Sequence, residues 1–318
     1  QIFSLYGKVR RPTDEMMETF DVLLVDLQDV GCRSYTYVTT LAYMLEVCSR
    51  HTKEVWVLDR PNPIGRPIEG TIVEPGWESF VAAGPLILRH GLTMGEIAGW
   101  YVSLKKLDLQ FDVVAMSGYG PDDPPGFGWP LGALSWVNPS PNASSLNMAR
   151  CFPATVLFEG TTLSEGRGTS TPLEVVGAPD VDFDAVLARM ESLAPRWLDG
   201  CSLRPCHFEP TFQKHIGKTC SGIQIHADGA AYRHERFRPY RLGAVMLKAI
   251  CLEYPDYDLW REFEYEYETQ RLAIDLISGG TLLRDWVDDP QASPVEFDER
   301  LAKDEQAWAE IRRPYLLY

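Results

Sequence analysis

Residues 21–60 read DVLLVDLQDVGCRSYTYVTTLAYMLEVCSRHTKEVWVLDR, and this stretch decides the fold class. Its apolar run Val22–Leu27 has the length of a buried strand, and Tyr37–His51 carries apolar residues at helical spacing. Val55–Leu58 is a second short apolar run. A strand, a helix and a second strand in this order favour a largely parallel sheet covered by helices, because parallel neighbours need a crossover connection.

The same alternation continues toward residue 116. Strands are expected at Leu86–Leu88 and Phe111–Met116, and a helix at Thr93–Lys106. Thr93 followed three residues later by Glu96 predicts a capping box at the start of that helix. Residues 117–150 contain many glycines and prolines, so they predict a long loop, and the aromatic residues in it favour an ordered and functional one.

The pattern changes after about residue 179, and 318 residues suggest two domains. We therefore expect an N-terminal domain over residues 1–180 and a smaller α/β domain over residues 181–318. The remaining expected elements are strands at Ala154–Phe158, Phe208–Phe212 and Gly222–His226 and helices at Phe183–Leu193 and Arg241–Glu253. The acidic and aromatic segment Glu262–Glu268 predicts a solvated face of a helix or strand.

Composition excludes several classes of function. The formal net charge is −15 with scattered Lys and Arg, which would repel a nucleic-acid backbone. No apolar run approaches the roughly 20 residues of a membrane span. The seven cysteines have no zinc-site spacing, so buried free thiols are the better interpretation, and we expect no metal and no cofactor. No GxGxxG, P-loop, HExxH or GxSxG motif is present.

The strongest polar segment is Glu159–Thr169, which contains Glu159, Glu165 and Arg167 beside three glycines and follows a predicted strand. Ligands bind beyond the carboxyl ends of parallel strands, so this position favours a functional site. Glycoside hydrolysis usually needs two carboxyl groups, one as acid and one as base or nucleophile. The alternative is an ion pair of Glu165 with Arg167 that braces a turn.

Two further polar segments follow predicted strands. In the first, Asp29 and Arg33 could bind sugar hydroxyls and a carboxylate, and Tyr35 and Tyr37 could stack on a sugar; helix capping and an ion pair are the alternative. In the second, two prolines hold Asn62, whose amide could bind an acetamido or hydroxyl group, although a stiff structural turn is the slightly favoured alternative. His90 follows another strand and is a candidate proton carrier or simply a structural histidine.

The chain resembles the NamZ family of exo-β-N-acetylmuramidases, formerly a family of unknown function. The similar segments run in order through nearly the whole chain: SLYGKVRRPT, DLQDVGCRSYTY, LDRPNPIG, RHGLTMGEIA, WVNPSPN, EGTTLSEGRGT, FQKHIGKTCSGIQIH and YLLY. The resemblance implies a Rossmann-like N-terminal domain, a smaller C-terminal domain and an active site in the cleft between them. It also implies removal of terminal, non-reducing β-1,4-linked N-acetylmuramic acid from peptidoglycan fragments.

The resemblance carries a set of site residues onto this chain. Glu165, Glu159 and His90 are the expected catalytic residues. The expected substrate-binding residues are Asp29, Arg33, Tyr35, Asn62, Asn142, Arg167, His215, Gln224 and His226. In this hypothesis Glu165 is the protonated acid, Glu159 activates water or stabilises the transition state, and Arg33 or Arg167 binds the lactyl carboxylate.

Family members also carry an upstream Ser-Pro-Glu-His-Gly motif, which is not in this sequence, and its Glu is a further candidate acid. We expect the sequence to lack an upstream segment. A non-catalytic muropeptide-binding protein is the alternative function, and a nucleotide-sugar transferase ranks last. The substrate favours a periplasmic or secreted location over the cytoplasm, and the sequence determines neither the compartment nor the oligomeric state.

Overall fold

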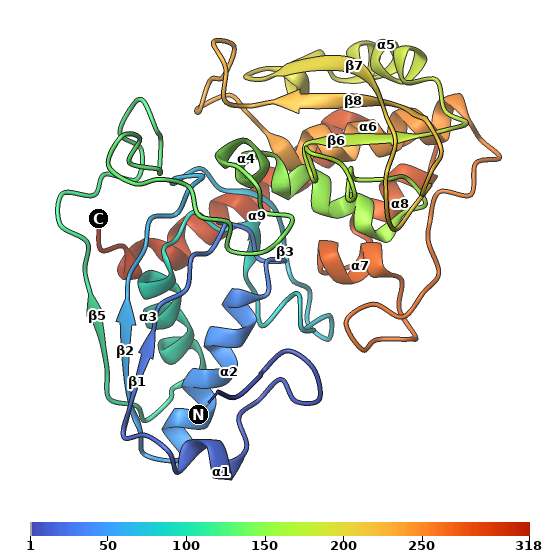
Figure 1. The fold of residues 1–318 in the computed structure, drawn as a ribbon. Helices are drawn as coiled ribbons and strands as arrows, with labels where there is room; N and C mark the ends of the chain where they lie inside the picture. The colour runs from blue at the N-terminus through green and yellow to red at the C-terminus, as the bar shows by residue number, and fades with distance from the viewer. Residues whose placement is uncertain (1) are drawn as a thin grey trace.

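A computed structural model describes residues 2–318 and shows a mixed α/β protein (Figure 1). The first sheet is parallel and has the strand order β1-β2-β5, with β1 at Val22–Val25, β2 at Glu54–Leu58 and β5 at Phe111–Val114. Helix α2 (Tyr37–Arg50) connects β1 to β2, and α3 (Met94–Lys105) precedes β5. The predicted elements of residues 21–116 are therefore present, with ends that differ by at most two residues.

Helices α2 and α3 share one hydrophobic core with the parallel sheet. Leu41 and Leu45 of α2 and Ile97 of α3 are buried in this core together with Val55 and Val57 of β2. The capping box predicted at Thr93 and Glu96 is also present. The opposite face of the sheet is open in the described chain, because Leu24, Trp56 and Val114 are 57%, 41% and 49% exposed. The side chains of a strand alternate between faces, so one covered face and one exposed face follow from the same strands.

The strand expected at Leu86–Leu88 does not join the parallel sheet. Strand β4 (Ile87–Arg89) pairs antiparallel with β3 (Glu69–Ile72), which the sequence analysis missed. A short α1 (Asp14–Met17) precedes β1. The C-terminal helix α9 (Pro294–Arg312) returns to this half of the protein and is followed by the single turn η3 (Arg313–Tyr315).

Helix α9, near the C-terminus, packs in the core of the N-terminal half. The indole of Trp308 on α9 is buried in the same core as α2 and α3, and its Nε1 donates to the carbonyl of His90 over 2.9 Å. A second and larger core contains Cys32 and Leu88 together with residues of the C-terminal half. The division into residues 1–180 and 181–318 stays a prediction, and the packing of α9 shows that the second part of the chain contributes to the core of the first.

The predicted strand Ala154–Phe158 is wrong. The segment forms the end of helix α4 (Leu146–Thr155) and the 3-10 helix η1 (Val156–Gly160). Ser145 begins α4 by accepting a hydrogen bond from the backbone N–H of Met148. Residues 147–158 are all buried, so this segment has no exposed polar face. The sequence therefore lacks the alternation of polar and apolar residues, at a spacing of three to four, that indicates a helix.

The C-terminal half contains an antiparallel sheet with the order β6-β8-β7. Its strands are β6 (Val175–Ala178), β7 (Ser202–Phe208) and β8 (Cys220–His226). The strand expected at Phe208–Phe212 ends at residue 208 instead; β7 is an edge strand, where the missing N–H of Pro205 is tolerated. Its helices are α5 (Phe183–Leu193), η2 (Pro195–Leu198), α6 (Pro239–Glu253), α7 (Ala273–Ser278) and α8 (Leu282–Asp288). The expected helices at 183–193 and 241–253 are confirmed.

The segment Glu262–Glu268 forms neither a helix nor a strand. It folds back as a tight turn in which Tyr265 and Glu268 exchange two backbone hydrogen bonds of 3.0 Å, and Tyr265 is buried. All seven cysteines are free thiols, as expected. Within residues 2–318, no helix combines the length and the apolar character that a bilayer crossing requires.

Candidate functional site

The segment 159–169 is a turn that several backbone contacts hold in place. It leaves η1, and Thr162 N donates to Leu259 O while Ser164 N donates to Gly177 O, both over 2.9 Å. Gly168 has a φ of +85°, and a Cβ there would lie 2.8 Å from the backbone nitrogen of Thr211. The glycine is therefore required by the close approach of two chain segments.

Arg167 is the centre of a charged cluster on this turn. Its Nε donates to Glu165 Oε1 over 3.0 Å, and its Nη2 donates to Glu159 Oε1. The other oxygen of Glu159 accepts a hydrogen bond of 2.9 Å from the hydroxyl of Tyr265. The other oxygen of Glu165 lies 2.7 Å from Lys214 Nζ. We call these five residues the Arg167 cluster.

The electrostatics of the Arg167 cluster follow from burial and from opposite charges. Burial lowers the pKa of Lys214, against the opposing effect of Glu165. Burial would also lower the pKa of Arg167, but the charges of Glu159 and Glu165 outweigh it and raise this pKa. Burial and the adjacent Glu159 raise the pKa of Tyr265 well above its ordinary value. The cluster thus contains a firmly protonated Tyr hydroxyl and a permanently charged Arg, each bound to Glu159.

Two cavities meet at the Arg167 cluster. The first, which we call cavity A, has a volume of about 520 Å³. Its lining includes Tyr35, Tyr37 and Asn142 opposite Glu159 and Arg167. The second, cavity B, has a volume of about 510 Å³. Its own lining residues include Gln213, Lys214, Arg261 and Phe263.

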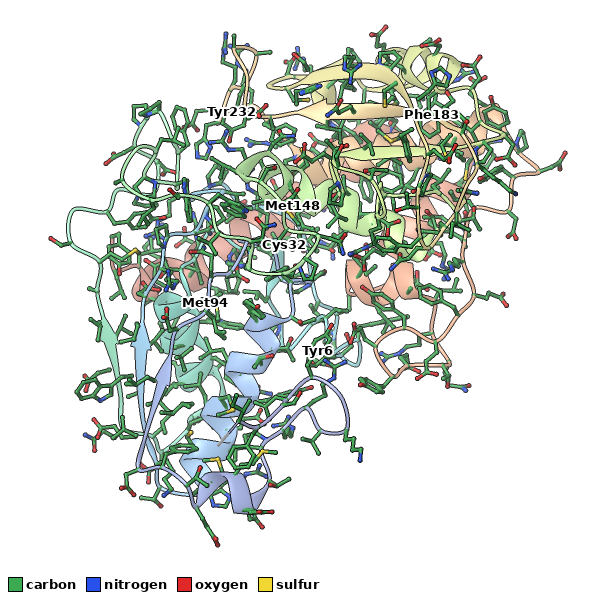
Figure 2. All side chains as sticks on the ribbon, in the orientation of Figure 1. Tyr6, Cys32, Met94, Met148, Phe183 and Tyr232 are labelled. Carbon is green, nitrogen blue, oxygen red and sulfur yellow. The ribbon has the colours of Figure 1, made fainter. Side chains whose placement is uncertain are left out.

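Cavities A and B share one wall. Both are lined by Tyr6, Glu159, Arg167, Tyr265 and Glu266. Tyr6 belongs to the N-terminal segment, and Figure 2 labels it on the side of the molecule where this segment lies. The shared wall is therefore built from the N-terminal segment, the turn 159–169 and the turn that contains Glu266.

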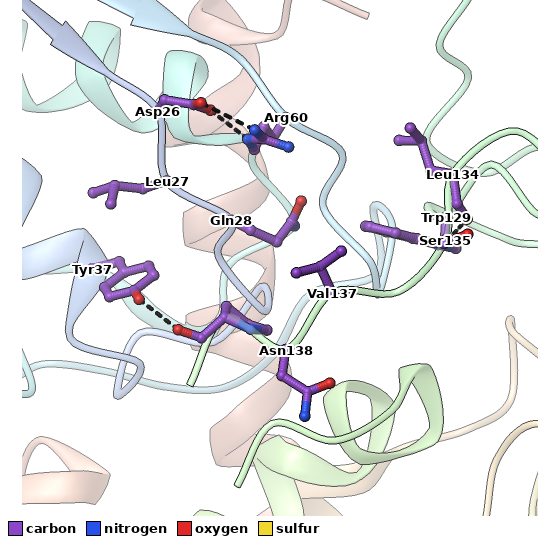
Figure 3. A pocket seen from close by; sticks show the side chains of 11 residues that line it. Asp26, Leu27, Gln28, Tyr37, Arg60, Trp129, Leu134, Ser135, Val137 and Asn138 are labelled. Atoms are coloured by element: carbon purple, nitrogen blue, oxygen red, sulfur yellow. Dashed lines mark hydrogen bonds and ion pairs between the residues drawn. The ribbon is translucent and has the colours of Figure 1, made fainter. Parts of the chain in front are cut away.

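A third cavity, also of about 520 Å³, lies beyond the carboxyl ends of β1 and β2 (Figure 3). An ion pair of Asp26 with Arg60 crosses it, and it meets cavity A at Tyr37 and Pro139. The hydroxyl of Tyr37 donates to the carbonyl of Pro139 over 2.7 Å, which closes the boundary between these two cavities.

The structure brings five of the predicted site residues together at these cavities. Tyr35, Asn142, Glu159 and Arg167 line cavity A, and Glu165 lines cavity B together with Glu159 and Arg167. The rings of Tyr35 and Tyr37 pack edge to face with centroids 5.0 Å apart. Cavity A therefore has two aromatic side chains in its lining, together with Glu159 and Arg167.

Arg33, which was predicted to bind a substrate carboxylate, lies in the interior of the protein, so the structure does not support this role. Its guanidinium is fully buried and donates to the carbonyls of Thr71 and Leu86 through Nη1 and to the carbonyl of Ile277 through Nη2, over 2.6–2.8 Å. These three carbonyls come from distant parts of the chain. Arg33 therefore connects the β3–β4 hairpin to α7 and has no access to a cavity.

Asp29, Asn62 and His90 are also buried away from the cavities. Asn62 holds its own turn, because its Oδ1 accepts from Ile64 N and its Nδ2 donates to Leu92 O. His90 is fully buried, and its Nε2 lies 3.4 Å from Asp29 Oδ2. A proton carrier must reach the substrate or a water beside it, so the catalytic role predicted for His90 is not supported.

The three residues predicted from the C-terminal motif do not line cavity A or B. The ring of His215 contacts the carbonyl of Thr162 over 2.9 Å, and burial lowers the pKa of this histidine. Gln224 lies on β8 and accepts a hydrogen bond from Arg204 of the neighbouring strand. His226 is the last residue of β8. Lys214, the neighbour of His215 in this motif, does line cavity B.

The sequence analysis missed Lys214, Tyr265, Glu266 and Tyr6. Lys214 lies within a segment that carried the family resemblance, but its role depends on the distant Glu165. Tyr265 and Glu266 belong to the segment that predicted a solvated face. The alternation of Glu with aromatic residues at 262–268 was the available signal for Tyr265 and Glu266. It was interpreted as a solvated face, whereas Tyr265 is buried.

A buried Arg between two carboxylates, beside a cavity with two tyrosines, defines a class of protein: a candidate glycoside hydrolase that acts on an acidic sugar. In residues 2–318, no group of three or more His, Cys, Asp or Glu side chains is placed to hold a metal ion.

Comparisons with known proteins identify the family. Residues 1–147 match the family described as "Exo-beta-N-acetylmuramidase NamZ, N-terminal", and residues 150–318 match the corresponding C-terminal family. The peptidoglycan beta-N-acetylmuramidase NamZ of Bacillus subtilis (strain 168) is 35% identical over 322 residues, which cover all of this chain and 72% of that protein. The chain belongs to the NamZ family of exo-β-N-acetylmuramidases.

Two crystal structures of DUF1343 family proteins from Bacteroides fragilis are similar to this fold. The first has a TM-score of 0.80 and 27% identity, and the match covers 99% of this chain and 79% of that one. The second has a TM-score of 0.72 and 24% identity, over 96% and 78% of the respective chains. The predicted family is therefore confirmed by both the sequence and the fold.

Proposed function

We propose that this protein is an exo-β-N-acetylmuramidase that removes terminal, non-reducing β-1,4-linked N-acetylmuramic acid from peptidoglycan fragments. Membership of the NamZ family and the similarity to the Bacillus subtilis enzyme support the activity. The structural observation that carries the proposal is the shared lining of cavity A by Glu159 and Arg167, which places a carboxylate and a cation beside one sugar-sized space.

Arg167 is the residue that would select muramic acid. N-acetylmuramic acid differs from N-acetylglucosamine by a lactyl ether that ends in a carboxylate, and a cation recognises a carboxylate with paired hydrogen bonds. Nε and Nη2 of Arg167 are bound by Glu165 and Glu159, and within residues 2–318 its Nη1 has no hydrogen-bond partner. We assign this nitrogen to the lactyl carboxylate, Tyr35 to stacking on the sugar and Asn142 to its polar groups.

Glu159 is the carboxylate that we place at the reacting centre. Arg167 and the hydroxyl of Tyr265 fix both of its oxygens. In this position it can stabilise the oxocarbenium-like transition state or accept the proton of a water molecule. We do not assign Glu165 the acid role of the original hypothesis, because it is paired with two cations, Arg167 over 3.0 Å and Lys214 over 2.7 Å, and it lines only cavity B. We assign Glu165 to the positioning of these two cations.

Three finer assignments also remain proposals. We propose that the parallel sheet and its helices form a Rossmann-like N-terminal domain, that the C-terminal half is a smaller α/β domain, and that the protein binds a peptidoglycan-derived sugar and no nucleic acid. The order β1-β2-β5 with helical crossovers supports the first, and the net charge of −15 supports the exclusion of nucleic acid.

A muropeptide-binding protein is the second candidate function. One observation favours it: both carboxylates of the Arg167 cluster are already bound to protein donors. A binding protein would use the same cavity and the same Arg167 without releasing a sugar.

The test is hydrolysis by the full-length protein of 4-nitrophenyl β-N-acetylmuramic acid and of its N-acetylglucosamine analogue. We expect release from the muramic substrate and at least about 10-fold less from the analogue, since the analogue lacks the carboxylate that would accept a charge-assisted hydrogen bond from Nη1 of Arg167, a bond worth about 1.5–3 kcal/mol. Saturable binding of the muramic compound by folded protein, with no release of 4-nitrophenol, would instead establish the binding protein.

A further inference from the structure

Glu266 is the second carboxylate of the shared wall between cavities A and B. It lines both cavities, as does Glu159, whereas Glu165 lines only cavity B. Its side chain is 23% exposed, so it reaches the cavities from a largely buried position. A substrate that extends from cavity A to cavity B would have its scissile bond near Glu159 and Glu266. Most glycosidases use two carboxyl groups beside the scissile bond.

The turn that presents Glu266 has an unfavourable backbone. Glu266 and Tyr267 have φ values of +48° and +71°, and Tyr265 and Glu268 on either side exchange both backbone hydrogen bonds. Two consecutive residues with positive φ are the pattern of a type I′ turn, in which Asn-Gly is strongly preferred. Glu and Tyr in these positions store strain, and such strain is concentrated at functional sites.

The groups that face Glu266 come from three parts of the chain. Arg10 of the N-terminal segment donates from Nη2 to Glu266 Oε2 over 2.9 Å, and Tyr6 of the same segment lines both cavities beside it. Glu159 and Arg167 belong to the turn 159–169, and Tyr265 precedes Glu266 in its own turn. Arg10 is itself held by the rings of Tyr6, Phe80 and Tyr267, at 4.0–4.7 Å.

We propose that Glu266 is the acid that protonates the leaving oxygen, at the junction of a sugar site in cavity A and a leaving-group site in cavity B. In this step the bond between the anomeric carbon and the bridging oxygen breaks, and the carboxyl proton of Glu266 moves to that oxygen. A water molecule adds its oxygen to the anomeric carbon and gives one proton to Glu159. Exchange with solvent then returns a proton to Glu266 and removes one from Glu159.

The protonation of Glu266 agrees with this role. Burial raises its pKa, the ion pair with Arg10 opposes this effect, and the negative charge of Glu159 adds to it. A raised pKa keeps a larger fraction of the carboxyl group protonated near neutral pH, which is the state that an acid catalyst needs. Glu159, which is bound to Arg167 and Tyr265, is the other carboxyl group of the shared wall.

The inference rests on the proposed function, and the dependence of the rate on the leaving group tests it. We compare the wild-type full-length protein with Glu266→Gln on two substrates, the disaccharide N-acetylmuramyl-β-1,4-N-acetylglucosamine and 4-nitrophenyl β-N-acetylmuramic acid. The sugar leaving group needs a proton, whereas 4-nitrophenolate leaves without one. We expect kcat/KM to fall by about 10²–10⁴-fold for the disaccharide and by less than about 10-fold for the 4-nitrophenyl substrate.

Glu264→Gln is the matched control, because Glu264 is exposed on the same turn-forming segment and has no ion-pair partner in the described chain. It should retain wild-type rates on both substrates. Equal losses of Glu266→Gln on the two substrates would show a structural role and overturn the inference, as would an undiminished rate on the disaccharide. No hydrolysis of either substrate by the wild-type protein would overturn the proposed function itself, and the acid role with it.

Discussion

Lys214 Nζ lies 2.7 Å from Glu165 Oε2, and the side chains of these residues are only 8% and 2% exposed. The same ammonium group donates to the carbonyls of Phe158 and Thr161 over 2.7 and 3.1 Å. The pair thus connects the segment around Lys214 to η1 and to the turn that presents Arg167. This ion pair joins two segments that form the wall of cavity B.

The first prediction concerns this buried pair. Glu165→Gln should lower the free energy of unfolding by about 3 kcal/mol, because it leaves the buried ammonium group of Lys214 without a carboxylate. Lys214→Met should lower it by less, because Arg167 still pairs with Glu165. The double variant should lose less than the sum of the two, since it removes both charges. Urea denaturation of the four proteins measures the coupling. Additive losses would show that the two charges do not stabilise one another.

The second prediction concerns the hydroxyl of Tyr265. Tyr265→Phe removes the hydrogen bond of 2.9 Å to Glu159 and should lower kcat by about 10-fold with little change in KM, because hydrogen bonds to charged groups are worth about 1.5–3 kcal/mol. Tyr267→Phe is the control. It removes a hydroxyl that donates to the carbonyl of Gly7, on a side chain that is 60% exposed. Steady-state kinetics that show the same loss for both variants would contradict the assignment.

The third prediction separates two arginines that the sequence analysis treated alike. Arg33→Lys should lower the free energy of unfolding by at least about 3 kcal/mol and leave KM unchanged, since one ammonium group cannot reach the three carbonyls that Arg33 binds. Arg167→Lys should instead raise KM for the muramic substrate by about 10-fold. Denaturation and kinetics on both variants make the comparison. A raised KM for Arg33→Lys would return it to the substrate site.

The fourth prediction is a pH dependence of stability at Glu266. Its pKa in the folded protein is raised above 4.5, so over the range just above pH 4.5 the folded state binds more protons than the unfolded state, and this group makes stability fall as pH rises. Glu266→Gln removes that fall. The melting temperature of the variant should therefore rise relative to wild type as pH increases from 4 to 8. A falling difference for Glu266→Gln would mean that its folded pKa is lowered.

The fifth prediction concerns the seven cysteines. Burial raises the pKa of Cys32 and of Cys201 to about 12 and also raises that of the partly buried Cys206. Because the thiolate is the reactive form, none of the seven should react with Ellman's reagent within minutes in the native protein, and all seven should react in guanidinium. A single thiol that reacts fast in the native state would identify a position whose burial or pKa differs from this description.

Local patterns in the sequence were sufficient for much of the fold. Val22–Val25 and Glu54–Leu58 were recognised from short apolar runs, and α3 from a capping box whose two partners are three residues apart. These signals lie within one element, so they can be seen without the rest of the chain. The prediction at Ala154–Phe158 was wrong because this segment is buried on all sides and shows no period.

The sequence by itself determined the family, the α/β class and the polar turn that contains Glu159, Glu165 and Arg167. The tertiary structure decided which of the polar residues reach a cavity. Arg33 and Arg167 are both arginines on glycine-containing turns. Arg33 donates to three backbone carbonyls in the interior, whereas Arg167 lines cavity A. The physical reason is that access to a ligand depends on partners distant in sequence, such as Ile277 for Arg33 and Tyr265 for Glu159, and only packing brings those partners together.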